Sequence, residues 1–362
     1  MGKLQVGFVG LRRGGGLVRA LAAHPRVEVA ALCDLKEETL TEMAPDYGLS
    51  DDRLFTAFDD FVNAALDIVV IATPIEFHAA QSIAALESGK HVLCEQTVAY
   101  TLDECAAVIA AQERTGNVYM MAENYCYFHY ILEWRKLVAR GTLGKLFYAE
   151  AEYVHEIADL LRDPETGTPK WRLPRAPIWY CAHTLGPVLT LMDDRIVKAT
   201  GASAGRNMHP EEKDLGHLDM EVGLFQTEKG NVVKILRSQV AHRHPHSVYY
   251  TLYGTKGFIE NGRHIEAGAS TGRYFNVDTM TKQTGAEEIA CPTVDRNAPP
   301  EALQGGHGTS EYFMVKDFIA AIDNNTKVPI DAVRAVEFTA PGIVAHEAAM
   351  QGGVWLDVPQ FR

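Results

Sequence analysis

Short apolar runs alternate with helical segments over the first third of the chain. Runs at residues 4–11, 27–34, 67–74, 91–95 and 117–124 have the length and composition of buried strands, and segments 17–23 and 83–88 have the pattern of helices. Strands that alternate with helices predict a doubly wound parallel sheet. Ligands bind such sheets at the carboxyl ends of the strands.

The pattern changes after a predicted helix at residues 132–141. Apolar and polar residues alternate at 147–155, and further half-exposed strands are predicted at 220–225, 232–240, 248–253 and 257–260, with hairpin turns at 227–231 and 254–257. A polar stretch at 159–175 is expected to form a lid, and residues 268–305 are expected to be irregular. Amphipathic helices are predicted at 313–324 and 332–351, both packing back on the first domain.

These patterns predict two domains. We expect an α/β Rossmann domain, a doubly wound parallel sheet, over residues 1–125. Residues 126–362 are expected to form an α+β domain with a large, mostly antiparallel open sheet. A length of 362 residues suits this division better than a single core.

Composition narrows the choice of partners. Hydrophobic residues make up 47% and charged residues 22% of the chain, as in globular proteins. The net charge of -13 and the absence of Lys/Arg runs argue against a nucleic-acid partner. No apolar run reaches the roughly 20 residues that span a bilayer, and the six cysteines show no CxxC spacing. We therefore expect a cytoplasmic protein with reduced thiols and no membrane partner.

A glycine-rich turn between the first strand and the first helix predicts a dinucleotide site. In this βαβ context helix N–H groups meet a pyrophosphate, and the acid that ends the second strand, Asp34, binds a ribose 2′-hydroxyl. Because that acid would repel a 2′-phosphate, NAD is favoured over NADP. The alternative is a structural βα turn that binds no nucleotide. The turn residues expected at the cofactor are Gly10, Arg12, Arg13, Gly14 and Gly15.

Polar residues also follow the later strands of the Rossmann pattern. The carboxyl edge of a parallel sheet is its ligand edge, so these residues are expected at the cofactor. Glu123 ends the last of these strands and is expected either to face a ligand or to cap a helix. The other residues predicted at this edge are Thr73, Pro74, His78, Glu95 and Gln96.

Tyr180 and His183 stand three residues apart in an apolar segment. If the segment is helical, both side chains lie on one face and address one substrate. The alternative is a buried amphipathic helix whose histidine is merely hydrogen-bonded. The spacing alone does not decide between the two.

Several motifs together resemble the Gfo/Idh/MocA family of nicotinamide-dependent sugar and polyol oxidoreductases. They are the turn at residues 10–16 with Asp34, the segment 72–78, the strand 89–95, and Gly144-Lys-Leu at the start of the second domain. Most dehydrogenases of this family carry a catalytic lysine where this chain has Gln96. A neutral amide cannot replace a cationic acid/base, so an ordinary dehydrogenase is disfavoured.

A branch without that lysine, the NAD-dependent glycoside hydrolases of family 109, is a closer match. The matching segments are 120–124, 144–155, 180–187 and 306–308. The resemblance implies an active site of Glu123, Tyr153, Tyr180 and His183, with substrate contacts from His155, His307 and Gln96. The loop between the two tyrosines is shorter here than in that family.

The resemblance also implies a reaction cycle. The sugar is oxidised at C3, the acidified C2 proton is removed, the aglycone at C1 is eliminated, water adds, and the ketone is reduced again. His183 is expected to take the proton of the C3 hydroxyl, and Glu123 to assist the leaving group or the water. Tyr153 or Tyr180 is expected to take the C2 proton. A phenol with a pKa of about 10 needs a nearby positive charge for that role.

Substrate and assembly follow from the same comparison. The expected partner is a small hexoside, such as an N-acetylhexosaminide, and the resemblance implies a homodimer or homotetramer. Trp171, Arg172 and Arg175 in the expected lid either stack on a sugar and bind an anionic group, as in a sulfoquinovoside, or belong to a solvated loop. The alternatives for function are a conventional NAD-dependent sugar dehydrogenase and an NAD-binding sensor without catalysis.

A run of three histidines is the competing metal motif. His242, His244 and His246 alternate along a predicted strand, a spacing that suits zinc. No nearby cysteine or acid completes the set, and Pro245 interrupts the strand. We therefore expect no metal.

Overall fold

The structure is a computed structural model that describes residues 2–208, 210, 218–263 and 269–361, without the side chains of residues 13, 158 and 269. The chain forms two compact units. Unit 1 comprises residues 1–127, 295–336 and 361–362, and unit 2 comprises residues 128–294 and 337–360.

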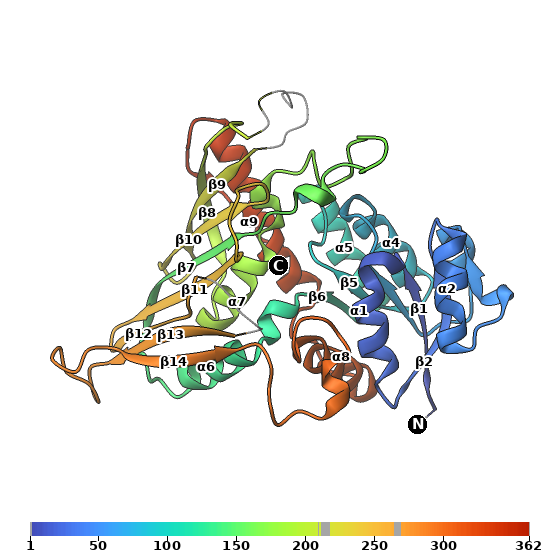
Figure 1. Cartoon of the computed structure of the whole chain (residues 1–362), viewed down its shortest axis with the longest axis horizontal. Helices are drawn as coiled ribbons and strands as arrows, with labels where there is room; N and C mark the ends of the chain where they lie inside the picture. The colour runs from blue at the N-terminus through green and yellow to red at the C-terminus, as the bar shows by residue number, and fades with distance from the viewer. Residues whose placement is uncertain (1, 209, 211–217, 264–268, 362) are drawn as a thin grey trace. The chain divides into compact units, whose positions relative to one another are not determined.

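Unit 1 contains a parallel sheet. Among the described residues its strands follow the order β3-β2-β1-β4-β5-β6, which is the doubly wound order with a switch point between β1 and β4 (Figure 1). The strands are β1 (Leu4–Val9), β2 (Val27–Cys33), β3 (Leu54–Phe55), β4 (Ile68–Ile71), β5 (His91–Glu95) and β6 (Tyr119–Ala122). The predicted Rossmann fold is confirmed.

Helices connect these strands and cover the sheet. Because βαβ crossovers are right-handed, helices before and after the switch point lie on opposite faces, and α1 packs with α2 while α4 packs with α5. The helices of unit 1 are α1 (Leu11–Ala22), α2 (Glu37–Tyr47), α3 (Phe58–Val62), α4 (Ile75–Glu87), α5 (Leu102–Thr115) and α8 (Ser310–Asn324), with 3-10 turns at η1 (Asp51–Arg53), η2 (Asn124–Tyr127) and η5 (Pro300–Leu303).

The first helix begins earlier than the sequence pattern predicts. α1 starts at Leu11, so the glycines expected in a turn before residue 17 lie inside the helix, and the N–H of Gly14 already bonds the carbonyl of Gly10 at 3.1 Å. Of the four glycines at positions 10 and 14–16, only Gly10 adopts the left-handed conformation, with φ 84°. An added Cβ at Gly10 would meet the backbone carbon of Ala72 at 2.6 Å, and one at Gly14 the Cβ of Ala72 at 3.0 Å. These glycines bring α1 close to β4, which explains why the helix tolerates them.

Unit 2 contains the second sheet. In the described ranges its order is β14-β13-β12-β11-β7-β10-β9-β8-β15, and all neighbours are antiparallel except β7 and β10 (Figure 1). The strands are β7 (Leu146–Val154), β8 (Ile196–Ser203), β9 (Met220–Thr227), β10 (Val232–Ser238), β11 (Ser247–Gly254), β12 (Gly257–Glu260), β13 (Ala269–Asn276), β14 (Glu287–Pro292) and β15 (Leu356–Asp357). The mostly antiparallel sheet is confirmed, but part of the stretch that was expected to be irregular forms the hairpin of β13 and β14.

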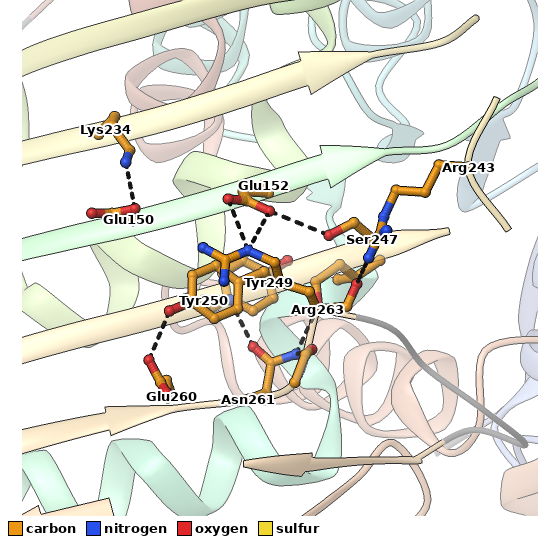
Figure 2. A network of polar contacts seen from close by, with 12 residues as sticks. Glu150, Glu152, Lys234, Arg243, Ser247, Tyr249, Tyr250, Glu260, Asn261 and Arg263 are labelled. Carbon is orange, nitrogen blue, oxygen red and sulfur yellow. Dashed lines mark hydrogen bonds and ion pairs between the residues drawn. The ribbon is translucent and has the colours of Figure 1, made fainter. Parts of the chain in front are cut away.

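The two faces of this sheet differ in polarity. Helix α7 (Ala182–Met192) packs on β7 and β11, and α6 (His129–Ala139) packs on α7. On β7, Ala149, Ala151 and Tyr153 are buried, whereas the alternate residues are polar and partly exposed. Figure 2 shows polar contacts made by those alternate residues, with Lys234 at 2.6 Å from Glu150 and Arg263 at 3.1 Å from Glu152. The buried face of β7 is therefore the face that carries Tyr153.

The last two helices divide between the units. α8 belongs to unit 1 and packs on α1, and Arg26 binds Asp323 at its end at 2.6 Å. α9 (Ala332–Met350) passes from unit 1 to unit 2 after Val336. Most of α9 therefore belongs to unit 2, and the expectation that it packs back on the first domain stays a prediction. No helix in the described part of the chain is long and apolar enough to cross a membrane.

The close approach at Gly10 gives a stability prediction. Gly10→Ala combines a left-handed backbone with a clash against backbone atoms, whereas Gly48→Ala, at φ 66°, meets no atom within 4 Å. We expect a loss of about 1 to 2 kcal/mol in the free energy of unfolding for Gly48→Ala, and at least about 3 kcal/mol for Gly10→Ala. Urea denaturation of both variants measures this. Equal losses would contradict the packing role of Gly10.

Candidate active site

The predicted cofactor residues of unit 1 surround the start of α1. This helix has no side-chain cap and no acidic residue in its first turn, so its N-terminus is suited to an anion. Asp34 follows β2 and accepts hydrogen bonds from the N–H of Leu11 at 2.9 Å and of Lys36 at 3.1 Å. Arg12 is exposed, and the side chain of Arg13 lies outside the described residues. The backbone approach at Gly10 and the acid at the end of β2 fit NAD.

The side chain of His78 connects two segments at the carboxyl ends of β4 and β5. The side chain is buried, and its Nδ1 and Nε2 lie 2.7 Å and 2.8 Å from the carbonyl oxygens of Thr97 and Thr73. Burial lowers the pKa of His78, against the effect of these two contacts. The hydroxyl of Thr73 donates to Gln81 at 2.6 Å, and Pro74 is the N-cap of α4. A contact of these residues with the cofactor remains a prediction.

Glu95, Gln96 and Glu123 lie at the carboxyl ends of β5 and β6, as predicted. Gln96 and Glu123 are buried, and Glu95 is partly buried. An oxygen of Glu123 accepts the N–H of Tyr125 at 3.1 Å, at the start of η2. Because Glu123 lies in unit 1 and the tyrosines of the predicted site lie in unit 2, their meeting at one substrate stays a prediction.

His307 is held by a buried acid within unit 1. Its Nδ1 lies 2.5 Å from Glu311 of α8, whose other oxygen accepts a hydrogen bond from Ser310. Burial alone would raise the pKa of Glu311, but the hydrogen bond and the charge of His307 bring it below its usual range. The same carboxylate accepts from the amide of Asn124 at 3.3 Å. This network fixes His307 beside η2.

The predicted catalytic side chains of unit 2 form one aromatic cluster. The ring of His183 lies 5.3 Å from that of Tyr153 and 5.2 Å from that of Tyr180, and the two tyrosine rings are 6.4 Å apart. Tyr153 comes from β7, Tyr180 from the 3-10 helix η4 (Pro177–Tyr180), and His183 from the first turn of α7. The alternative in Sequence analysis was a buried helix whose histidine is merely hydrogen-bonded. That alternative does not describe the whole arrangement, because the ring of His183 also lies against both phenol rings.

A buried acid holds η4 in place. Glu221 of β9 accepts the N–H of Ile178 at 3.0 Å, and its other oxygen lies 2.8 Å from Nδ1 of His346 on α9. His346 in turn packs edge-on against the ring of Trp179, with centroids 5.3 Å apart. Tyr180 is thus positioned by a strand and a helix that lie far from it in the sequence.

Arg237 on β10 is a member of the cluster that the sequence analysis missed. Its guanidinium carbon lies 4.3 Å from the centroid of Tyr153 and 5.3 Å from that of Tyr180, and the side chain is only 1% exposed. A signal existed in the strand pattern, because Val233, Ile235 and Arg237 occupy its buried alternate positions. The arginine stands where an apolar residue is expected. It places a positive charge beside the two tyrosines that the sequence analysis named as candidate bases.

His155 extends the cluster. Its Nδ1 lies 2.8 Å from the hydroxyl of Tyr153, and its ring lies 4.8 Å from that of His246. The neighbouring Glu156 binds His242 at 2.8 Å and His244 at 3.0 Å, which anchors the histidine-rich segment. Within the described ranges, no group of three or more His, Cys, Asp or Glu side chains is arranged to hold a metal ion.

The loop at residues 159–175 is anchored rather than freely solvated. Leu161 and Leu173 pack with Val240 in a small buried cluster. Arg172 lies over the ring of Trp171 at 4.1 Å, and Arg175 lies over that of Tyr180 at 4.1 Å. Arg175 is also buried and hydrogen-bonded to the amide of Gln239. Three guanidinium groups therefore lie in and beside the aromatic cluster of a chain whose net charge is -13.

Solved structures with the same fold include oxidoreductases. An oxidoreductase domain protein from Kribbella flavida matches with a TM-score of 0.82 at 20% identity, over 99% of this chain and 100% of that one. Levoglucosan dehydrogenase in complex with NADH and levoglucosan matches with a TM-score of 0.81 at 19% identity and the same coverage. At these identities the likeness concerns the fold alone.

Family models match both parts of the sequence. Residues 4–123 match the oxidoreductase family with an NAD-binding Rossmann fold, the Gfo/Idh/MocA type, which makes this part an NAD-binding domain. Residues 127–362 match the C-terminal domain of glycosyl hydrolase 109. Since this second model covers more than half of the chain, the chain belongs to glycosyl hydrolase family 109. It is an NAD-dependent enzyme of the glycosidase or oxidoreductase type.

Relatives named as glycosyl hydrolase family 109 proteins align over the whole chain. The protein from Shewanella pealeana is 27% identical over 395 residues, covering 100% of this chain and 86% of that protein. The protein from Solibacter usitatus is 28% identical over 397 residues, covering 99% of this chain and 88% of that one. The resemblance stated from the motifs is confirmed.

The contacts of Asp34 lead to a binding prediction. We expect Asp34→Ala to weaken NAD binding about 10- to 100-fold, because a charged acceptor for the ribose is worth about 1.5–3 kcal/mol. Isothermal titration with NAD measures the change. The matched control is Glu28→Ala, which removes an exposed acid from the same strand. Unchanged affinity in Asp34→Ala would contradict the assignment.

Proposed function

We propose that this protein hydrolyses hexosides by transient oxidation at C3, elimination of the aglycone, addition of water and re-reduction. The observation that carries the proposal is the cluster of Tyr153, Tyr180 and His183 around a buried guanidinium in a chain that belongs to glycosyl hydrolase family 109. Two phenols and an imidazole are groups that hold and move protons. The neutral Gln96 at the end of β5 argues against lysine-dependent dehydrogenation.

The side chains of the cluster suit the proton transfers of this cycle. When bound, NAD accepts a hydride from the sugar and later returns it, so that it is not consumed. His183 takes the proton of the C3 hydroxyl, since imidazole ionises near neutral pH. A tyrosine removes the C2 proton, which the C3 ketone has made acidic. Glu123 assists departure of the aglycone or activates the incoming water.

The charge near the cluster bears on the substrate. Arg172 is partly exposed beside Trp171, and planar guanidinium groups bind carboxylates, sulfonates and phosphates with two hydrogen bonds. We therefore propose a sugar that presents either an anionic substituent or an acetamido group to this loop. A sulfonated hexoside such as a sulfoquinovoside and an N-acetylhexosaminide are the two candidates.

Stoichiometry tests the reaction. Incubated with aryl glycosides of both anomers and sub-stoichiometric NAD, the enzyme is expected to release many equivalents of phenol per NAD. In deuterated water the released sugar is expected to carry deuterium at C2, because the C2 proton exchanges with solvent during the cycle. Absorbance and mass spectrometry measure the two quantities. One NADH formed per turnover, without phenol release, would instead establish a conventional dehydrogenase.

A second prediction concerns charge selectivity. Arg172→Ala is expected to lower kcat/KM for an anionic glycoside about 10- to 100-fold, because it removes a charge-assisted hydrogen bond worth about 1.5–3 kcal/mol. The matched neutral glycoside should change less than threefold on the same scale. Lys170→Ala, which removes a cation paired with Asp163 at 3.7 Å in the same loop, is the control. Equal losses of kcat/KM on both substrates would show that Arg172 supports the structure of the loop and does not bind the anionic group of the substrate.

A further inference from the structure

Arg237 is a buried cation without a carboxylate partner. Its Nε donates to the carbonyl of Pro177 at 3.5 Å, and its two terminal nitrogens have no hydrogen-bond partner in the part of the chain that the structure describes. The side chain forms no ion pair with any described acid, although it is only 1% exposed. Arginine does not lose its proton in proteins, so a full positive charge stands in the interior of unit 2.

The nearest acid in the sheet register does not neutralise this charge. Glu221 lies opposite Arg237 in the antiparallel ladder of β9 and β10, so both side chains leave the sheet on the same face. The two oxygens of Glu221 are directed to the N–H of Ile178 and to Nδ1 of His346, at 3.0 Å and 2.8 Å. Its charge serves the positioning of η4.

Four titratable side chains remain around the guanidinium. Burial lowers the pKa of Arg237, while Tyr153, Cys181, Tyr180 and Tyr250 act in the opposite direction. Two of the four need their protons. The thiol of Cys181 donates to the carbonyl of Phe338 at 3.0 Å, and the hydroxyl of Tyr250 donates to the carbonyl of His183. Tyr153 and Tyr180 are the two groups that can supply a counter-charge.

The surroundings favour Tyr153 over Tyr180. Arg237 lies closer to Tyr153, at 4.3 Å against 5.3 Å, and parallel pairing of β7 with β10 places the two residues side by side. The hydroxyl of Tyr153 also has a proton acceptor, Nδ1 of His155, at 2.8 Å. A second cation, Arg175, lies over the ring of Tyr180, but the hydroxyl of Tyr180 has no hydrogen-bond partner among the described residues to take its proton.

Several groups face Tyr153 from the elements packed around it. His155 lies on its own strand, Arg237 on β10, His183 on α7 and Tyr180 on η4. His246 stands behind His155, and burial together with the charges of His244 and Arg243 lowers the pKa of His246. Arg237 is the permanent cation among these neighbours.

We propose that Arg237 is a positioning residue that holds Tyr153 as a phenolate at neutral pH, with the guanidinium as its counter-ion. The proton leaves Tyr153 through His155 to solvent. A cation over the ring face attracts the ring of a phenolate more strongly than that of a neutral phenol. Arg237 never exchanges a proton and acts through Tyr153.

The inference deepens the proposed function and rests on it for the reaction. The phenolate oxygen forms an O–H bond as the C2–H bond of the 3-keto sugar breaks, and the electron pair of that bond passes into the enolate. Departure of the aglycone then consumes the enolate. Glu123 gives a proton to the leaving aglycone and regains one from the water that adds at C1. The proton on Tyr153 exchanges with solvent through His155, and Tyr153 then protonates C2 and is again a phenolate beside Arg237. Protons and electrons balance over the cycle.

Titration of the phenol tests the ionisation without any substrate. The near-ultraviolet absorbance of phenolate is followed against pH in the NAD-bound enzyme and in its Tyr153→Phe, Tyr180→Phe and Tyr148→Phe variants. We expect one phenolate already at about pH 7, far below the usual value of about 10, and we expect only Tyr153→Phe to abolish it. Tyr148 is the matched control on the opposite face of β7, where burial and the bond to Glu150 raise the pKa of Tyr148 to about 12.

Substitution of Arg237 tests its role. In Arg237→Gln the titration is expected to move upward by about 2 pH units or more, whereas Arg237→Lys keeps the charge and most of the phenolate. In Arg237→Gln the acidic limb of the plot of kcat against pH should move upward by the same interval, and activity should recover at high pH. A merely structural role would lower kcat at every pH without moving the limb.

The outcomes separate the two proposals. Loss of the neutral-pH phenolate in Tyr180→Phe instead of Tyr153→Phe, or its persistence in Arg237→Gln, would overturn the inference. If Arg237→Gln does not fold, by circular dichroism and NAD binding, the comparison of wild type, Tyr153→Phe and Arg237→Lys decides. A phenolate that depends on Arg237 in an enzyme that releases no aglycone would support the inference and refute the hydrolase.

Discussion

The pairing of β7 with β10 is the constraint on which the candidate site depends. These are the only parallel neighbours among the described strands of the second sheet, and their register sets Arg237 beside Tyr153. Burying a guanidinium costs several kcal/mol that hydrophobic packing does not return. In this fold the guanidinium of Arg237 lies over the faces of aromatic rings. Tyr180 and His183 then complete the cluster from η4 and α7.

The two units use different means to fix their functional groups. In unit 1 the ligand edge is built largely from backbone, through the conformation of Gly10, the amides bound to Asp34 and the carbonyls that hold His78. Such contacts shape a rigid binding edge for a cofactor. In unit 2 side chains from a strand, a 3-10 helix and a helix meet ring to ring, and a buried acid, Glu221, holds the 3-10 helix. This arrangement suits groups that must exchange protons.

The candidate site carries a buried positive charge on Arg237 and a neutral amide at Gln96. Most Gfo/Idh/MocA dehydrogenases have a lysine where Gln96 stands, and a lysine can both carry charge and release a proton. Arg237 carries charge but releases no proton. In the proposed mechanism the two duties are therefore divided between an arginine, which supplies the field, and a tyrosine, which moves the proton. This division is consistent with membership in glycosyl hydrolase family 109.

The sequence by itself determined the local features of this protein. Hydrophobic periodicity predicted the Rossmann strands and the second sheet, and motif spacing predicted Asp34 and the pair of Tyr180 and His183, because such signals lie within a few residues of each other. Tyr153 entered the predicted site through the family resemblance. The tertiary structure decided what depends on pairing between distant segments. The strands β13 and β14, the early start of α1 and the meeting of Arg237 with Tyr153 all follow from contacts that no local pattern encodes.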